Sequence, residues 1–331
     1  MQNPRRWLKW TGGMMMAQAP RASTFAAGGA AFMAGASYGV VTPLAKLAQG
    51  QGLTAGQLAL FQYAVPLVVL WTASWLKGKP PTLGGSSWWP PALAGISAGM
   101  TSWLYYGALA HLSAGLAVLL LFQFAWMVVV VEAIAKRRCP QPRILWSVGL
   151  VWVGTVTSVG FGLGLDLRAS LVGWALGIGA GAAYAVSLYA NGQMDPRLPT
   201  AWRAATAASL ACLTVLTTAW LAGSQTVRWP TEPQAWGWLV AVGCFSQALP
   251  VWLLAWSAPR IGGTLAAILA SSELPVALVG SWIALGQRFG WLTWVGVAII
   301  LSGIGLGQSA EAESLALQPS TLQGASRRRQ R

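Results

Sequence analysis

Apolar residues run along this chain in long segments that short polar stretches separate. An α-helix needs about 20 such residues to cross the roughly 30 Å hydrocarbon core of a bilayer. A sliding window of about 19 residues finds ten segments of that length. They lie near residues 24–47, 56–76, 88–110, 113–135, 144–163, 170–191, 201–223, 234–257, 262–286 and 290–308. The pattern predicts ten transmembrane helices.

The composition agrees with this pattern. The chain has 331 residues, of which 55% are hydrophobic and 8% charged, and its mean hydropathy is +0.56. A soluble domain carries about 25% charged residues. We therefore expect an all-α integral membrane protein. Its ends would be a cytoplasmic N-terminal segment, residues 1–23, and a disordered basic tail, residues 309–331.

The basic residues are distributed unevenly over the predicted loops. Lys and Arg concentrate on the cytoplasmic side of membrane proteins. With both termini in the cytoplasm, ten helices place 17 of the 21 basic residues on that side. We therefore expect a multi-pass protein of the inner or plasma membrane with cytoplasmic N- and C-termini. The net charge of +14 then reflects basic loops beside an anionic leaflet and needs no nucleic acid as partner.

Two short sequences in different halves of the chain resemble each other. When "AAFMAGASYGVV" is aligned with "LGIGAGAAYAVS", Gly35 lies over Gly181 and Tyr38 over Tyr184. Small residues at this spacing let helix backbones approach closely, so each copy should pack tightly against a neighbour. Five helices per half is an odd number, which requires the second copy to be inverted. The two inverted repeats would be residues 24–163 and 164–308.

One carboxylate, Glu273, lies inside the apolar stretch "LAAILASSELPVALVGSW". An ionised carboxylate at the bilayer centre costs about 2.5–3.5 kcal/mol, so it should face protein or water. Pro275 lacks an N–H and crowds the carbonyl of Ser271, which should interrupt the helix there. Ser271, Ser272 and Glu273 would then form a polar interruption. In one interpretation Glu273 stays protonated and only joins two helices; in the other, which we favour, it binds substrate or a proton.

At this point the sequence resembles a known family. Ten helices in two halves, with "APRIGGTLAAILASSELPVALVGSWIALGQRFGWLTWVGVAIILSGI" near the end, are similar to the EamA-type branch of the drug/metabolite transporter superfamily. In that branch the penultimate helix of each half carries small residues and then an acidic or polar residue followed by proline. The second half matches through Glu273 and Pro275. The first half departs from it, because "LFQFAW" has Gln123 and no proline follows.

The resemblance and the inverted repeat together imply a secondary active transporter of a small metabolite or drug-like compound. It would work by alternating access around a central site, with export the direction we favour and protons a candidate coupling ion. The lipid bilayer is its other partner, and the chain would act as a monomer or homodimer without a cofactor. Candidate binding or coupling residues are Pro275 and the polar or aromatic side chains at midplane depth: Glu273, Ser271, Ser272, Tyr38, Tyr184, Gln62, Gln123, Gln247, Trp126 and Trp252.

Other functions are kept as alternatives. A non-transporting membrane partner or a channel is one, although a pore should show polar faces along several helices. An intramembrane serine hydrolase is a remote one, because "GASYG" matches G-x-S-x-G at Ser37 and His111 is the only histidine. The chain has no Walker motif and no metal-ligand cluster, so we expect no enzyme and no metal. Glu132 lies four residues before Lys136, which predicts an exposed ion pair.

Overall fold

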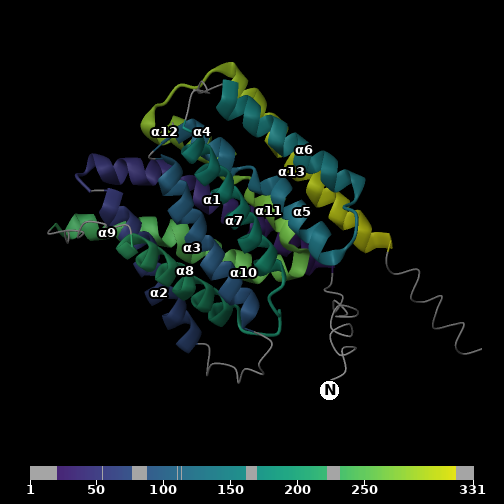
Figure 1. Cartoon of the computed structure of the whole chain (residues 1–331), viewed down its shortest axis with the longest axis horizontal. Helices are drawn as coiled ribbons and strands as arrows, with labels where there is room; N and C mark the ends of the chain where they lie inside the picture. Colours follow the sequence, from purple (N-terminus) through teal and green to yellow (C-terminus); the bar gives the residue numbers. More distant parts are fainter. Residues whose placement is uncertain are drawn as a thin grey trace, which may run out of the picture.

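The structure is a computed structural model that describes residues 21–53, 55–76, 88–109, 111–112, 114–161, 170–221 and 232–317. These residues form helices and no β-strand, which confirms the predicted all-α class. In chain order the helices are α1 (Arg21–Gly50), α2 (Ala55–Leu76), α3 (Trp89–Leu109), α4 (Ala114–Leu121), α5 (Phe124–Lys136), α6 (Pro142–Thr155), the π-helical η2 (Val156–Phe161), α7 (Leu171–Gly192), α8 (Thr200–Leu221), α9 (Pro233–Gly243), the π-helical η3 (Cys244–Ala248), α10 (Leu249–Ile261), α11 (Gly263–Ala270), α12 (Glu273–Leu285) and α13 (Trp291–Leu317) (Figure 1).

Each predicted apolar segment coincides with one helix or with helices that adjoin along the chain. Within the described part of the chain, six helical stretches are by length and composition able to cross a membrane, and Phe61–Leu76 is apolar but shorter. The six are Thr24–Gly50, Leu116–Lys136, Leu171–Gly192, Pro233–Ile261, Gly263–Leu285 and Trp291–Ser309. Helix α13 continues to Leu317, beyond the predicted end at residue 308. The rest of the predicted tail, from residue 318, and the N-terminal segment through residue 20 lie outside the described residues.

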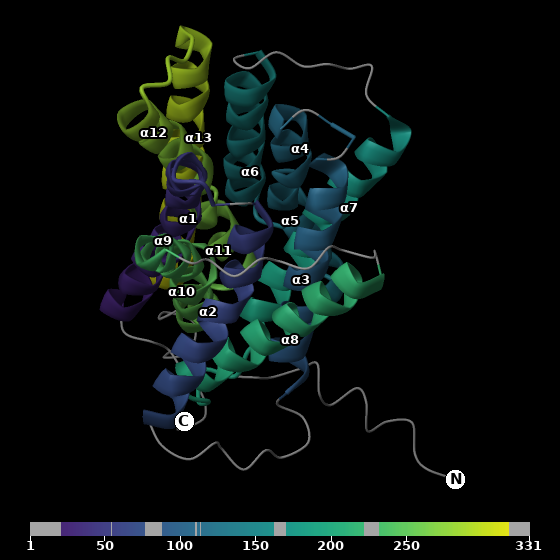
Figure 2. The same cartoon turned by 90° about the vertical axis from the view of Figure 1, so that its left-hand side faces the viewer.

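Two helical segments are interrupted at corresponding places. Helices α4 and α5 have 8 and 13 residues and are separated at Phe122 and Gln123. Helices α11 and α12 also have 8 and 13 residues, and Ser271 and Ser272 separate them. In Figures 1 and 2, α4 and α12 lie toward one end of the molecule and α5 and α11 toward the other. The two broken helices therefore run in opposite directions.

We name the two ends of the molecule by residues that lie there. At the Lys46 end, α1 and α12 finish and α4 begins; at the Glu132 end, α5 finishes and α11 begins.

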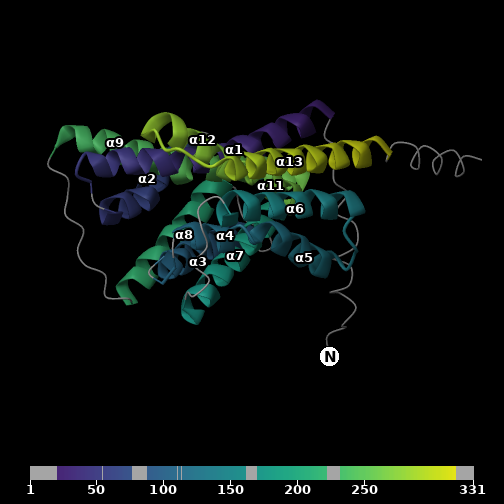
Figure 3. The same cartoon turned by 90° about the horizontal axis from the view of Figure 1, so that it is seen from above.

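The helices are arranged in two layers, which Figure 3 shows from above. In the first, here called the α1 layer, α1 packs against α10, α11 and α12, and α2 packs against α9. In the second, the α7 layer, α3 packs against α7 and α8, and α7 packs against α4 and α5. Contacts between α6 and α13 and between α2 and α8 join the layers at their two edges.

The layers do not follow the two halves of the sequence. Helices α1 and α2 lie in the same layer as α9 to α13, whereas α3 to α6 lie with α7 and α8. Each layer therefore combines helices from both predicted repeats. Any motion of one layer against the other would separate parts of the same repeat.

The predicted close packing at Gly35 and Gly181 is confirmed. A Cβ atom added to Gly35 would lie 2.7 Å from the carbonyl carbon of Ala270, just before the break between α11 and α12. A Cβ atom on Gly181 would lie 2.9 Å from the carbonyl oxygen of Leu120, just before the break between α4 and α5. Real Cβ contacts are longer than this, so each glycine allows a helix backbone to approach a break directly.

Candidate functional site

A cavity of about 640 Å³ lies between the two layers. Helices of both layers line it: α1, α2, η3, α10 and α12 on one side, and α3, α4, α7 and α8 on the other. At the Lys46 end its wall includes the exposed side chains of Lys46 and Gln49. At the opposite end it is bounded by Ser187 and Asn191, which are buried. The cavity is therefore open at the Lys46 end and closed at the Glu132 end.

Glu273 lies in the wall of this cavity. It is the first residue of α12, directly after the break at Ser271 and Ser272. The first turn of a helix has unpaired N–H groups and a partial positive charge, which favours a carboxylate at this position. Tyr38 of α1 and Tyr184 of α7 line the same cavity and interact electrostatically with Glu273. The glutamate is thus exposed to the cavity between two tyrosines from opposite layers.

The two serines before Glu273 lie outside the cavity wall. Both are fully buried and neither lines the cavity. The hydroxyl of Ser271 donates to the carbonyl oxygen of Ala267 at 3.1 Å, and the hydroxyl of Ser272 donates to the carbonyl oxygen of Phe32 at 2.8 Å. Pro275 lines a second, wholly apolar hollow between α12, α1 and α13. Of the polar residues at this break, Glu273 is the one whose side chain lines the cavity.

The corresponding break in the first half contributes a phenylalanine instead of an acid. Phe122 lines the cavity, while Gln123 does not. The side-chain oxygen of Gln123 accepts hydrogen bonds from the indole N–H groups of Trp126 and Trp152, both at 2.8 Å. Its amide nitrogen donates to the carbonyl oxygen of Leu119 at 3.0 Å. Gln123 therefore holds α5 against α6, and Trp126, which is 41% exposed, takes part in that contact.

The remaining predicted residues divide between the cavity and the packing. Gln62, Gln247, Tyr38 and Tyr184 line the cavity together with Glu273, and their role in binding stays a prediction. Trp252 instead packs against a buried cluster, mostly alanines, to which α2, α3, α7, α8 and α10 contribute.

Several lining residues were not predicted from the sequence. The polar or aromatic ones are Thr42, Lys46, Gln49, Thr101, Ser102, Tyr105, Ser187, Asn191, Ser246, Ser281, Gln287 and Phe289. Asn191 could have been found by the rule that selected the glutamines, because it is an amide at the end of an apolar segment.

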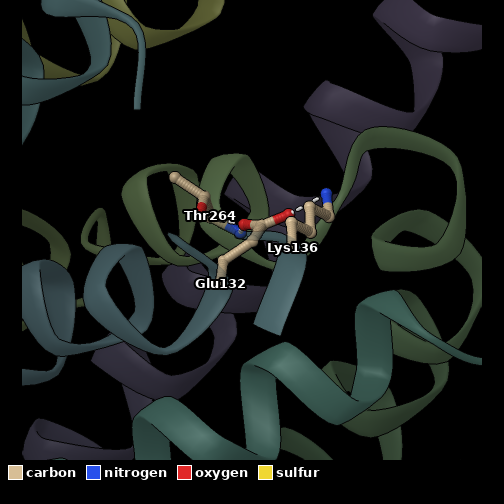
Figure 4. Close-up of polar contacts among 3 residues, drawn as sticks. All are labelled: Glu132, Lys136 and Thr264. Carbon is tan, nitrogen blue, oxygen red and sulfur yellow. Dashed lines mark hydrogen bonds and ion pairs between the residues drawn. The ribbon is translucent and has the colours of Figure 1, made fainter. Parts of the chain in front are cut away.

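Contacts between the layers close the Glu132 end. The carboxylate of Glu132 forms an ion pair with Lys136, which confirms the predicted pair. The same carboxylate also accepts hydrogen bonds from the hydroxyl of Thr264 and, at 3.1 Å, from the backbone N–H of Thr264 (Figure 4). Its side chain is only 13% exposed, so the expectation of an exposed carboxylate was wrong. Glu132 thereby caps the start of α11 and joins the α7 layer to the α1 layer.

Two glycines bring the same two layers together beside Glu132. A Cβ atom on Gly192, at the end of α7, would lie 2.6 Å from the backbone nitrogen of Gly263, at the start of α11. Backbone atoms of the two layers are therefore almost in contact at this end. Among the described residues, α4 and α12 make no comparable contact at the Lys46 end.

The residues proposed for a hydrolase are not brought together. The hydroxyl of Ser37 is buried and donates to the carbonyl oxygen of Phe245 at 2.7 Å. His111 is exposed on the connection between α3 and α4, and no hydrogen bond joins it to Ser37 in the described part of the chain. The described residues also contain no group of His, Cys, Asp or Glu able to hold a metal ion.

Apolar helices long enough to cross a membrane, in two layers around a cavity, define the class of this protein, a multi-pass membrane protein. Residues 168–306 match the model of the EamA-like transporter family, whose members are transporters and not enzymes. The match confirms the resemblance to the drug/metabolite transporter superfamily on the half of the chain that carries Glu273.

The fold is shared with a solved structure described as "Crystal structure of protein". It has a TM-score of 0.66 and 17% sequence identity, and the alignment covers 86% of this chain and 98% of that chain. The comparison with curated proteins gave no match.

Proposed function

We propose that the chain is a secondary active transporter that moves a small molecule by alternating access. The cavity carries this proposal: it lies between two layers, is polar at one open end and is closed at the other. A channel needs a path that is open at both ends while it conducts. A membrane partner without transport activity needs no polar cavity at all. A cavity open at one end is what alternating access requires in one of its two states.

We also propose that the chain crosses the membrane ten times as two inverted repeats. The equal lengths of the broken helices and their opposite directions support this. The packing supports it too, because exchanging the repeats exchanges real contacts: α3 with α7 corresponds to α10 with α1, and α3 with α8 corresponds to α9 with α2. Exchanging the repeats maps the pair α6 and α13, and the pair α2 and α8, onto itself, which is expected of pairs that lie on a two-fold axis.

In this proposal the moving bodies are the two layers and not the two halves of the sequence. Contacts of α11 with α5 and α7 and of α10 with α7 and α8 would have to separate at the Glu132 end. The Lys46 end would close in exchange, by approach of α4 to α12. The edges, where α6 meets α13 and α2 meets α8, would act as hinges.

We assign the Glu132 end to the cytoplasm of an inner or plasma membrane, with both termini on that side. The basic residues Lys136, Arg137, Arg138 and Arg143 follow α5 there, which supports this orientation. The cavity then opens to the outside. Glu273 would bind a proton and the transported molecule in turn. The direction we propose is export of the molecule, driven by protons that move inward down their gradient.

Transport by reconstituted vesicles tests the proposal. Compounds from several chemical classes would be screened for flux driven by an imposed pH gradient, with Glu273→Gln vesicles as the matched control. We expect at least one compound that the parent moves and the variant does not. Flux through the parent protein that neither saturates with concentration nor responds to the pH gradient would favour a channel instead.

The two-state motion has a separate test that needs no known substrate. In a background without Cys139, Cys212 and Cys244, a single cysteine would be placed at Ala45, which lines the cavity, or at Ala204, which is buried at the closed end. Membrane-impermeant reagents should modify position 45 from the outside. Position 204 should react slowly, from the cytoplasmic side, and both rates should change in opposite directions when substrate is added. Alternating access would be contradicted if substrate did not change the two modification rates in opposite directions.

A further inference from the structure

Arg203, the fourth residue of α8, is fully buried. It is the largest of the side chains that are completely shielded from solvent. One of its terminal nitrogens, Nη2, donates to the hydroxyl of Thr200 at 3.2 Å. Its other two nitrogens, Nε and Nη1, have no hydrogen-bond partner among the residues that the structure describes. Buried polar groups are nearly always paired, so a guanidinium in this state requires an explanation.

No carboxylate of the described residues forms an ion pair with Arg203. Among the described residues the ion pair joins Glu132 and Lys136, and Arg203 takes no part in it. Asp195 interacts with Arg203 electrostatically but does not reach it with a bond, and the nearby cation Arg260 opposes it. A buried charge without a paired counter-charge is strongly unfavourable. The fold therefore holds a cationic group for which the described residues supply no anion.

The position of Arg203 relates it to the cavity. Arg203, Ala207 and Ala211 follow one another at four-residue intervals on one face of α8, and Ala207 and Ala211 line the cavity. Arg203 thus lies about one helical turn, roughly 5 Å, beyond the cavity wall on the closed side. Ala204 and Ala207, which neighbour Arg203 along α8, belong to a buried cluster that also includes Ala190 of the α7 layer and Ala255 of the α1 layer.

This cluster belongs to the contact that alternating access would break. Helices α8 and α7 meet α10 across the boundary between the layers. When the layers separate at the Glu132 end, the face of α8 that carries Arg203 would be continuous with the cavity wall. The alanines of this cluster have side chains too small to cover a guanidinium once α10 has moved away.

We propose that Arg203 binds an oxyanion of the transported molecule, a carboxylate or a phosphate, when the closed end opens. The guanidinium offers charge-assisted N–H donors that match both groups. The proposal rests on the proposed transport function and adds a substrate class to it: small organic molecules that carry an oxyanion. Glu273 and Arg203 would then face the transported molecule from opposite ends of its path.

Thermal unfolding of the purified chain in detergent, followed by tryptophan fluorescence, tests this assignment. The probes are sodium acetate and sodium phosphate, compared with sodium chloride at equal ionic strength and with neutral acetamide. The variants are Arg203→Met and, as a control of equal charge, Arg138→Met, whose side chain is exposed on the same side of the molecule. We expect acetate or phosphate, and neither control, to raise the Tm of the parent and of Arg138→Met by a few degrees.

Arg203→Met should lose this rise in Tm. Without anions its Tm should equal or exceed that of the parent, because a buried unpaired charge has been removed. A parent that responds equally to chloride, or an Arg203→Met variant that keeps the full response, would overturn the proposal. If Arg203→Met does not fold, Arg203→Lys decides: it keeps the charge but not the planar donors, so at least half of the rise should disappear, and a full rise would overturn the assignment.

The result of this anion-binding test can be distinguished from the result of the transport test. Glu273→Gln should retain the anion-dependent rise in Tm, since Glu273 lies in the cavity wall at the start of α12, whereas Arg203 lies on α8 beyond that wall. If no compound is transported while this rise is present and depends on Arg203, the transport proposal fails and the anion site stands. If transport is found for neutral compounds alone and no rise occurs, the anion site fails.

Discussion

The hydroxyl of Ser272 donates a hydrogen bond to the carbonyl oxygen of Phe32 across 2.8 Å, and this bond joins the break before α12 to the middle of α1. Gly35, one turn further along α1, lies directly against Ala270 and Ser272. The serine therefore satisfies the backbone of a neighbouring helix, and the glycine gives it room to do so. Glu273 is the next residue, so its position in the cavity depends on this contact.

Replacing Gly35 by Ala should destabilise the chain by about 1–3 kcal/mol, because the added methyl group would overlap the Ala270 carbonyl group. Replacement by Leu should be worse and should impair membrane accumulation. Gly29→Ala is the matched control, since no atom lies within 4 Å of a Cβ at that position of the same helix. Thermal unfolding of the purified variants measures the difference. Equal Tm values for Gly35→Ala and Gly29→Ala would refute the close contact.

Glu273→Gln should fold normally but lose transport driven by a pH gradient, because glutamine keeps the shape and hydrogen bonding of the acid and cannot release a proton. Glu273→Asp should keep part of the activity. Uptake into vesicles with an imposed gradient measures both, and downhill exchange of substrate serves as the control for binding. Gradient-driven transport by the Gln variant at the parent's rate would leave Glu273 a structural bridge.

Glu132→Ala and Lys136→Met should differ greatly in their effects, although they remove two partners of one ion pair. Glu132 also accepts the backbone N–H and the hydroxyl of Thr264, and such charge-assisted bonds contribute about 1.5–3 kcal/mol. Lys136, by contrast, is the exposed partner, and an ion pair at this spacing on a helix contributes about 0.3–0.5 kcal/mol.

A cysteine at Ala204 should therefore react much faster in the Glu132→Ala background and almost unchanged in the Lys136→Met background. Maleimide labelling rates in membranes measure this. Similar rates in both would mean that Glu132 does not hold the closed end.

Cys139 reports the orientation of the chain. It is exposed, whereas Cys212 is buried and Cys244 is partly buried. A membrane-impermeant maleimide should label Cys139 in inside-out vesicles and not in intact cells, and Cys139→Ser should abolish that labelling. Labelling of intact cells through Cys139 would reverse the proposed orientation.

The helices were predictable because the length of an apolar run is a local property of the sequence. Pro275 also made the break before Glu273 predictable, since a missing N–H disrupts a helix wherever it occurs. The break at Phe122 and Gln123 carries no such residue and was missed.

Contacts distant along the chain were also missed. Thr264 lies 132 residues from Glu132, and Trp152 lies 29 residues from Gln123. The order of apolar segments does not state which helices become neighbours, so neither the two layers nor these partners followed from the sequence. Gln123 was placed in the site for this reason, because a polar residue in an apolar run is equally consistent with a cavity and with a tryptophan partner.

The cavity with one open end also determines where a membrane voltage acts on the molecule. Moving an elementary charge through the full voltage changes its free energy by about 2.3 kcal/mol per 100 mV. In the proposed orientation, a cavity continuous with the outer solution would have nearly the potential of that solution, so the voltage would fall mainly across the closed region between Glu273 and the Glu132 end. A proton that reaches Glu273 through the cavity would therefore cross only a small part of the membrane voltage. The voltage would then act on the reorientation of the layers, when the ionised carboxylate changes sides, and hardly at all on proton binding.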